Sequence, residues 1–466
     1  MTSELGKIKV NSIVFLVLLL AISGPSWSQF SANKMACWPQ EWWIGMKYNK
    51  VQVLIKGNNL STARAAVSHS GVSINDQYGA KNKDYLFVEL DITKNASAGM
   101  FAIRITRGNT PVGTVNFTLR NRTNNYFPSP LTGADAIYQI VPDRFANGNP
   151  DNDNIIDLFE KADRSNPSGV HGGDIQGLSN AMNYIKDLGF NTVEFTPLYE
   201  SNQLILSYDK FAPTSHFNVD KRIGSLNDIK NTIQQFRNNQ LKVIITQVFH
   251  KAGNQHVIFQ SPPDPDWVFK RDLLSLEKPN PLVYVDPYAA QEDIDRHSKI
   301  WESFDRPALN LQNKELKKYL VQHVLWWVET FQPDGVKIDQ THLCHPEFLA
   351  QLTQVLRDEY PNLNILAAPE AKDAGLNAYW QHDHKNKFQF THLTDGPLKE
   401  AVNDAFAAYS DTHEALFPIY QTLASDHIYN DAINQIILNG DNHHSTDFLP
   451  WQKKIWPCLN FIWASC

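Results

Sequence analysis

The sequence predicts an α/β protein in which a small β-sandwich is followed by a parallel sheet or a (β/α) barrel, and three observations support this. Its 466 residues exceed the roughly 100 to 200 residues of one domain, which indicates two or three domains. Short alternating apolar runs fill the segment from about Cys37 to Asn121. After the polar segment Asn121–Gly133, short apolar strands alternate with helical stretches.

The first domain is predicted as a β-sandwich within residues 29–125. Turn residues such as Gly57–Asn59 and Gly108–Asn109 separate its apolar runs, as is typical of small sandwich domains. The predicted strands are Val51–Ile55, Tyr85–Ile92, Met100–Ile105 and Val115–Leu119.

The second domain is predicted over residues 134–466. Helical stretches such as Ile229–Asn238 and Leu316–Phe331 fall between its strands, which favours parallel pairing. The segment at about 250–310 is too long for an ordinary connection, so we expect a small insert at the rim of the sheet where active sites form. The predicted strands are Ile137–Val141, Thr192–Thr196, Val243–Gln247, Gly335–Asp339, Ile365–Pro369, Phe388–His392 and Ile436–Asn439.

A closed (β/α)8 barrel requires one more strand than these seven. The chain ends at Cys466 inside the helical stretch expected after the seventh strand, and Pro457 fits that helix poorly. The sequence therefore predicts a barrel truncated before strand 8, whose first and seventh strands expose unpaired edges.

Composition excludes several classes of protein. With 42 basic and 49 acidic side chains, a net charge of −7 and 42% hydrophobic residues, the chain is neither disordered nor collagen-like. Its mildly acidic balance argues against a nucleic-acid partner. No stretch beyond the N-terminus approaches roughly 20 apolar residues, so no membrane span is predicted. The 4 cysteines are too widely spaced for a disulfide framework and are expected to be buried or free thiols.

Residues 1–28 have the pattern of a secretory signal peptide. Lys7 and Lys9 precede an apolar run from Ile13 to Ile22, and small residues follow up to Ser28, after which we expect cleavage. The protein is therefore predicted to be secreted, with the periplasm as its expected location. Nothing in the sequence predicts its oligomeric state.

Six short motifs occur along the chain from Trp38 onward. They are Glu41–Met46, Tyr138–Gly148, Gly172–Leu178, Leu309–Asn313, Leu325–Val328 and Asp334–Asp339. Together and in this order they resemble the α-amylase superfamily of glycoside hydrolases, in particular the bacterial neopullulanase and cyclomaltodextrinase group. The resemblance implies a (β/α)8 TIM-type barrel, an N-terminal β-sandwich, and α-1,4-glucan oligosaccharides such as maltodextrin or cyclodextrin as partners. Because a fold alone does not fix an activity, the site must be judged residue by residue.

Asp339 and Glu370 each close an apolar strand, which places them at the carboxyl rim of the predicted barrel. Retaining cleavage of a glucosidic bond requires a carboxylate nucleophile and a carboxylic acid about 5 Å away. By resemblance, Asp339 would be the nucleophile and Glu370 the acid/base. The alternative is that both are surface or capping residues at strand ends.

Several positions around these carboxylates depart from the family pattern. After the third strand, the family's Asp, Asn and His are Thr246, His250 and Lys251 in this chain. After the seventh strand, the family's Asn-His-Asp stretch keeps its histidine as His443, but His444 replaces the aspartate. By resemblance, both histidines lie at substrate-binding positions.

Two further substrate-binding positions also differ. Lys337 stands where the family has an arginine, and the two are not equivalent where a planar fork must hold a carboxylate. The family's Tyr-His-Gly-Tyr stretch reads Tyr208–Phe211, which retains Tyr208 as a possible sugar contact. Since each contact made mainly in the transition state contributes roughly 10²-fold or more to the rate, these replacements indicate a degraded active site.

Three hypotheses about function therefore stay open. The first is a glycosidase that still works through Asp339 and Glu370, with His250 or Lys251 compensating for the replaced residues. The second is a non-catalytic glucan-binding protein, and the third is an unstable truncated remnant.

A polar loop near the start of the barrel predicts a structural calcium site. Oxygen ligands grouped within a few residues suit a hard cation that takes six to eight oxygens. The alternative is an ordinary turn built from Asn, Asp, Gly and Pro. By resemblance, the calcium ligands would be Asn147, Asn149, Asn152, Asp153, Gly172 and Asp174.

The tryptophan pair Trp42 and Trp43 allows two interpretations. Their rings could stack on a glucan, or they could fill the core of the sandwich, which we favour. Trp326 and Trp327 lie in a predicted helix, so at least one is expected to be buried against the barrel.

Overall fold

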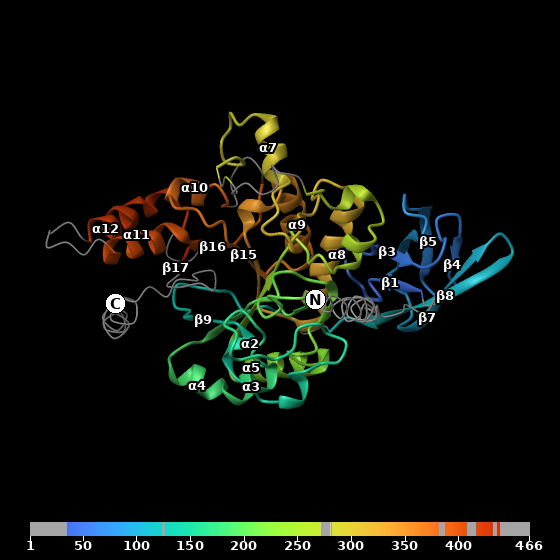
Figure 1. The fold of residues 1–466 in the computed structure, drawn as a ribbon, viewed down its shortest axis with the longest axis horizontal. Helices are drawn as coiled ribbons and strands as arrows, with labels where there is room; N and C mark the ends of the chain where they lie inside the picture. Colours follow the sequence, from blue (N-terminus) through green and yellow to red (C-terminus); the bar gives the residue numbers. More distant parts are fainter. Residues whose placement is uncertain are drawn as a thin grey trace, which may run out of the picture.

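The computed structural model describes residues 35–123, 126–271, 280, 282–381, 387–407, 416–431 and 436–438. A β-rich N-terminal domain lies at one end of the molecule and a parallel sheet with its helices in the middle, while helices α11 (Gly396–Ala407) and α12 (Phe417–Ala424) lie at the other end (Figure 1). The predicted signal peptide 1–28 lies outside the described residues. Over the described ranges, no helix is long and apolar enough to cross a membrane.

The N-terminal domain contains two four-stranded sheets, as expected for a sandwich. All neighbouring strands pair antiparallel except β2 and β8, which run parallel. One sheet is ordered β1 (Ala36–Trp38), β3 (Lys50–Lys56), β6 (Tyr85–Ile92) and β5 (Val72–Gly79). The other is ordered β2 (Glu41–Ile44), β8 (Thr110–Asn121), β7 (Gly99–Arg107) and β4 (Arg64–Ala66). The four predicted strands are present as β3, β6, β7 and β8.

Aromatic side chains form much of the domain core. Trp42 and Trp43 are 0% and 5% exposed, which confirms the predicted core packing. The indole Nε1 of Trp42 donates to the carbonyl oxygen of Tyr48 at 2.9 Å, so the buried ring leaves no polar atom unsatisfied. Cys37 is also buried in this domain as a free thiol, as is Cys344 in the barrel, which agrees with the prediction for these two cysteines.

The second domain is built on one parallel sheet of seven strands. The strands occur in chain order across the sheet, so each crossover moves the chain to the next position, as it does in a (β/α) barrel. They are β9 (Ile137–Ile140), β10 (Thr192–Phe195), β13 (Lys242–Gln247), β14 (Gly335–Ile338), β15 (Asn364–Ala367), β16 (His392–Asp395) and β17 (Ile436–Leu438). The chain after Leu438 lies outside the described residues, so the truncation before strand 8 stays a prediction.

One predicted strand is wrong in position. The apolar run Phe388–His392 was expected to form strand 6, but β16 begins only at His392. Phe388 instead stacks on Trp380 at a centroid distance of 5.4 Å and packs against Phe390. The aromatic run therefore fills a hydrophobic cluster beside the sheet, and the less apolar residues that follow provide the strand.

The remaining elements surround this sheet. Predicted helical stretches 229–238 and 316–331 lie in α5 and α8, as expected. The elements are α2 (Pro142–Phe145), α3 (Ile175–Asn180), α4 (Met182–Asp187), β11 (Tyr199–Glu200), β12 (Ser215–Val219), α5 (Leu226–Asn238), α6 (Val257–Gln260), α7 (Gln291–Ser298), α8 (Lys314–Phe331), α9 (Pro346–Glu359) and α10 (Ala374–Ala378).

The expected insert between β13 and α8 is present and carries α6 and α7. Its two ends are held together, because the Leu309 N–H donates to the His250 carbonyl at 2.8 Å and the Ala252 N–H donates to the Pro307 carbonyl at 3.1 Å. The insert is therefore anchored at the end of β13, beside the carboxyl rim of the sheet.

Helix α8 joins the two domains. Its N-terminus is capped by Asn313, whose Oδ1 accepts from the N–H groups of Glu315 and Leu316. Gln322 then makes two hydrogen bonds with the backbone of Gln52 in β3, at 2.7 and 2.8 Å. Both Trp326 and Trp327 are buried, which agrees with the prediction that at least one would be.

Arg122, just after β8, forms the main charged contact between the domains. Its guanidinium pairs with Glu329 of α8 at 2.6 Å and with Glu359 of α9 at 2.7 Å, and both carboxylates are almost fully buried. Tyr360 donates a further hydrogen bond to Glu329 at 2.8 Å. One arginine is thus the shared ion-pair partner of two buried carboxylates that belong to two different helices.

We predict that Arg122→Met lowers the free energy of unfolding by roughly 3–5 kcal/mol, because it leaves these carboxylates buried without a counter-charge. Arg120→Met is the matched control, since Arg120 pairs with Glu41 but is 52% exposed and should cost at most about 1 kcal/mol. Urea unfolding of the three proteins measures both values. Equal losses in the two variants would contradict the assignment.

Candidate active site

The predicted catalytic carboxylates lie at the carboxyl ends of two neighbouring strands. Asp339 directly follows β14 and is 3% exposed, and its N–H donates to the carbonyl of Gln247, the last residue of β13, at 3.0 Å. Glu370 comes shortly after β15 and is exposed. Its backbone is left-handed, with φ 53°, a conformation that costs a non-glycine residue energy and is common at functional sites. The fold therefore brings both residues to one rim.

Lys337 lies on β14, two residues before Asp339, and its ammonium forms an ion pair inside the barrel. Its Nζ donates to Glu194 Oε1 on β10 at 2.6 Å, and the same oxygen accepts from Gln139 Nε2 on β9 at 2.5 Å. Lys337 and Glu194 are both buried. This chain of contacts joins β14 to β10 and β9 across the intervening β13, and a substrate contact by Lys337 stays a prediction.

Tyr208 lies on the long loop between β11 and β12 and is half-buried. The guanidinium of Arg144, from α2, lies over its ring at 3.8 Å from the ring centroid, which is a close cation–π contact. Arg144 also pairs with Asp143. The contact between Arg144 and Tyr208 thus joins the segment after β9 to the loop after β11 at this rim.

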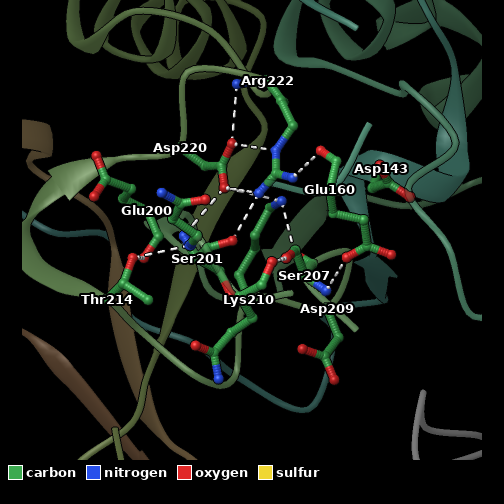
Figure 2. A network of polar contacts seen from close by, with 12 residues as sticks. Asp143, Glu160, Glu200, Ser201, Ser207, Asp209, Lys210, Thr214, Asp220 and Arg222 are labelled. Atoms are coloured by element: carbon green, nitrogen blue, oxygen red, sulfur yellow. Dashed lines mark hydrogen bonds and ion pairs between the residues drawn. The ribbon is translucent and has the colours of Figure 1, made fainter. Parts of the chain in front are cut away.

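A buried network of charges fixes the loop that carries Tyr208 (Figure 2). Asp220 pairs with Lys210 at 3.0 Å and with Arg222 at 2.7 Å, and each of the three side chains is at most 1% exposed. Burial by itself opposes ionisation of Asp220, but the two cations outweigh it and hold the pKa of its carboxyl well below the usual value. The carboxylate is therefore the shared counter-charge of two buried cations.

Backbone groups complete this network. Arg222 donates to the carbonyl oxygens of Ser201 and Glu160 at 2.7 and 3.0 Å, and Lys210 donates to the carbonyl of Ser207 at 2.8 Å. The Glu160 carboxylate accepts from the Ser207 N–H at 2.7 Å (Figure 2). The start and the middle of the loop, and the segment that contains Glu160, are thereby tied to one buried centre.

Beside Asp339, charged side chains from three segments form a continuous ion-pair chain, which we call the rim chain: Asp209, Arg306, Glu302 and Lys251. Arg306 pairs with Asp209 at 2.6 Å and with Glu302 at 3.0 Å. Lys251 pairs closely with Glu302, and its Nζ donates to Gln340 Oε1 at 2.9 Å. The rim chain links the insert to the loop of Tyr208 and to the residue after Asp339.

Burial and the charge of Arg306 lower the pKa of Lys251 to about 7, while Asp339, Asp209 and Glu370 act in the opposite direction. His250 is fully buried, and desolvation, with the charge of Lys251, lowers its pKa far below the usual value. His250 is therefore neutral at pH 7, whereas Lys251 lies close to its titration point.

The polar loop predicted to bind calcium is folded around Asp153. The Asn147 amide donates to Asp153 Oδ1 at 2.7 Å, and Gly172, with φ 83°, passes so close that a Cβ there would lie 2.5 Å from the same oxygen. Asn147 Oδ1 and Asn152 Oδ1 are buried and receive no hydrogen bond from the described part of the chain.

Asn149 and Asp174 have other contacts. Asn149 Oδ1 accepts from the Asp151 N–H at 3.2 Å. Asp174 caps helix α3 by accepting from the Gly177 N–H at 2.7 Å, and it also accepts from the N–H groups of Gly148 and Asn149. Three of the six predicted ligands, Asn147, Asp153 and Gly172, thus meet at one point, while Asn149 and Asp174 stabilise the backbone around it.

Sequence reasoning missed most of the rim chain. His443 and His444, the predicted sugar contacts after strand 7, lie outside the described residues. Glu302 and Arg306 belong to an insert without a recognisable motif, and only their i, i+4 spacing and their position before the Leu309 motif could have indicated a paired function.

Comparison with known families agrees with this architecture. The family "Alpha amylase, catalytic domain" matches residues 139–443, and the family "Cyclomaltodextrinase, N-terminal" matches residues 37–123. Because the first match covers well over half of the chain, the protein belongs to the α-amylase family of glycoside hydrolases. Within that family, its N-terminal domain and its relatives place it with the cyclomaltodextrinase and neopullulanase group.

Individual relatives are distant. Cyclomaltodextrinase of Thermoanaerobacter pseudethanolicus is 25% identical over 335 residues, which cover 69% of this chain and 52% of that protein. Neopullulanase 2 of Thermoactinomyces vulgaris is 26% identical over 249 residues, covering 52% of this chain and 40% of that protein. An α-amylase of Geobacillus thermoleovorans, solved with acarbose, shares the fold with a TM-score of 0.52 at 23% identity over 65% of this chain and 60% of that one. The chain spans about half the length of the curated relatives it matches.

We predict that Asp220→Asn destabilises the protein by roughly 3–5 kcal/mol, since Lys210 and Arg222 would stay buried without a counter-charge. The loop between β11 and β12 should then become the first site of cleavage in limited proteolysis. Asp228→Asn is the control, because Asp228 is an exposed cap of α5 whose loss costs about 1 kcal/mol. An intact loop in Asp220→Asn would refute the anchoring role.

Proposed function

We propose that this protein hydrolyses α-1,4-glucans through Asp339 and Glu370, at a rate reduced by the replacements around them. The position of these two carboxylates, at the carboxyl ends of adjacent strands in a member of the α-amylase family, carries the proposal. The names of the relatives, cyclomaltodextrinase and neopullulanase, suggest maltodextrin or cyclodextrin as the class of substrate.

The proposed reaction is a double displacement. Asp339 attacks the anomeric carbon while Glu370 gives its proton to the leaving oxygen, so that a glycosyl ester forms and the glucosidic bond breaks. Glu370 then removes a proton from water, whose oxygen displaces Asp339 and releases the sugar. The burial of Asp339 strengthens its electrostatic contact with a developing positive charge, whereas exposed Glu370 can exchange its proton with solvent.

A specific observation favours a second candidate, a glucan-binding protein without turnover. Thr246 and Lys251 replace the family's Asp and His after strand 3, and Lys337 is committed to Glu194. The contacts that strengthen in the transition state would then be lost, while the rim could still bind a glucan.

The test is release of glucose or maltose from maltodextrin and from cyclodextrin by the purified chain, together with calorimetric binding. Hydrolysis that Asp339→Ala or Glu370→Gln reduces by roughly 10³-fold or more would support the proposal. Binding that survives Asp339→Ala without turnover would favour the second candidate. A cooperatively folded chain that neither binds nor cleaves these glucans would refute both.

We further propose that the loop at Asp153 holds a structural Ca²⁺. The carboxylate of Asp153, two buried amide oxygens of Asn147 and Asn152, and the close approach of Gly172 fit a hard cation. Such an ion would tie the loop after β9 to the Gly172 segment.

Calcium should therefore raise the unfolding temperature relative to the chelator-treated protein by roughly 2–5 °C, measured by differential scanning fluorimetry. Asp153→Ala should remove this difference. Asp157→Ala should keep it, because Asp157 is exposed outside the loop. The same unfolding temperature with calcium and with chelator would exclude the site.

We also propose that the protein is secreted, on the basis of the charged and apolar pattern of residues 1–28. Fractionation of the native host should then place the processed chain in the periplasm or medium. Recovery of an unprocessed chain from the cytoplasm would refute this.

A further inference from the structure

Lys251 is a buried cation for which the proposed mechanism has no use. It follows β13, where the insert begins, and its side chain is 1% exposed. An ammonium group in such a place is costly unless it is paired, and Lys251 pairs with Glu302 and donates to Gln340 Oε1 at 2.9 Å. Since Gln340 directly follows the predicted nucleophile Asp339 in the chain, the position of this charge suggests a role in the site.

Lys251 also interacts with the two predicted catalytic carboxylates. Asp339 and Glu370 both stabilise its charged form, from the ends of two neighbouring strands. By the same Coulomb interaction, the ammonium favours the ionised form of each carboxylate. The hydrogen bond from Lys251 Nζ to Gln340 Oε1, on the residue after Asp339, places the ammonium at the same rim.

The other lysine near Asp339 is used elsewhere. Lys337, which replaces the family's arginine at a predicted substrate-binding position, has its Nζ 2.6 Å from Glu194 Oε1, and both side chains are buried inside the barrel. The Glu194 carboxylate already pairs with this charge, so a cation for the site has to come from another residue.

We propose that Lys251 is a positioning residue that supplies the counter-charge of Asp339, and that the rim chain of Glu302, Arg306 and Asp209 holds it in place. The proposal rests on the proposed function, because it names what keeps the nucleophile ionised. The positive charge beside the nucleophile is then that of Lys251, which follows β13 and is oriented by the insert. It is not that of Lys337 on β14, the strand that ends before Asp339.

The surroundings of Lys251 fit this role. The neighbouring histidines are held neutral by burial, which lowers the pKa of each, so they do not supply a competing charge. The centroid of the buried Phe211 ring lies 5.7 Å from Nζ, so an apolar side chain covers one side of the ammonium. The titratable and charged groups around Lys251 are Asp209, Glu302, Arg306, His250, His297, His342, Asp339, Cys344 and Glu370.

The test compares four variants of the full chain: Lys251→Met, Lys251→Arg, the double variant Lys251→Met with Glu302→Gln, and the control Lys318→Met. The double variant removes the carboxylate that Lys251→Met would leave without its partner. Lys318 also makes an ion pair, 2.6 Å from Glu89, but lies on α8 at the contact between the domains. It controls for the loss of any lysine ion pair.

The pH profile of glucan hydrolysis is the first readout. Loss of the counter-charge should move the acid limb of kcat/KM to higher pH by about one unit or more in Lys251→Met and in the double variant. Lys251→Arg should restore the original limb, and Lys318→Met should keep it. A merely structural lysine would lower the rate at every pH without moving the limb, which would overturn the proposal.

A second readout does not depend on turnover. Infrared difference spectra of protein with isotope-labelled aspartate carboxyls follow the ionisation of Asp339, whose band Asp339→Asn identifies. Protonation of Asp339 should occur at higher pH in Lys251→Met and the double variant than in the wild type. If the wild type hydrolyses no glucan but this shift is present, the proposed function fails while the role of Lys251 stands. An unchanged titration of Asp339 overturns the role of Lys251 whether or not the protein is active.

Discussion

The register of the parallel sheet is the constraint on which the candidate site depends. Gln247 pairs with Ile338, and Ile338 pairs with Ala367, so the last residues of β13, β14 and β15 lie at one level. Buried strands must satisfy their backbone hydrogen bonds by pairing with each other, because no solvent reaches them. Their register is fixed by the side chains, since a slip of one residue would turn every side chain to the opposite face of the sheet. The residues that follow the strands are therefore delivered to one rim, however far apart they lie in the chain.

Burial of charge imposes a second constraint, and the protein meets it repeatedly by sharing one ion between partners from different segments. Asp220 pairs with both Lys210 and Arg222, and Arg122 pairs with both Glu329 and Glu359. A buried charge without a partner costs several kcal/mol, so each shared ion fixes the segments that contribute to it. These centres act as rigid points to which the longer loops are attached.

The rim chain extends this arrangement to the candidate active site. Arg306 of the insert pairs with Asp209 in the loop of Tyr208 and with Glu302. Glu302 in turn pairs with Lys251, which donates a hydrogen bond to Gln340, the residue after Asp339. The replaced residues of the family pattern are thus not simply missing contacts. Asp209 and Lys251, which stand where the family has histidines, are the two ends of one ionic chain, so the replacements are complementary to each other and to a pair in the insert.

The sequence by itself determined the order of the elements, the strand ends that carry Asp339 and Glu370, and the oxygen-rich loop at Asp153, because periodicity and local motifs are properties of short segments. It misplaced strand 6, since an aromatic run such as Phe388–Phe390 can fill a core as readily as a sheet. Only the tertiary structure decided the partners of the charged residues. Lys337 was predicted to bind substrate, but it pairs with Glu194. Lys251 was predicted to be the replacement of a lost active-site histidine, but it contacts Gln340, the residue after Asp339. Both outcomes follow from ion pairs between distant segments, and spacing along the chain carries no information about which charges burial will bring together.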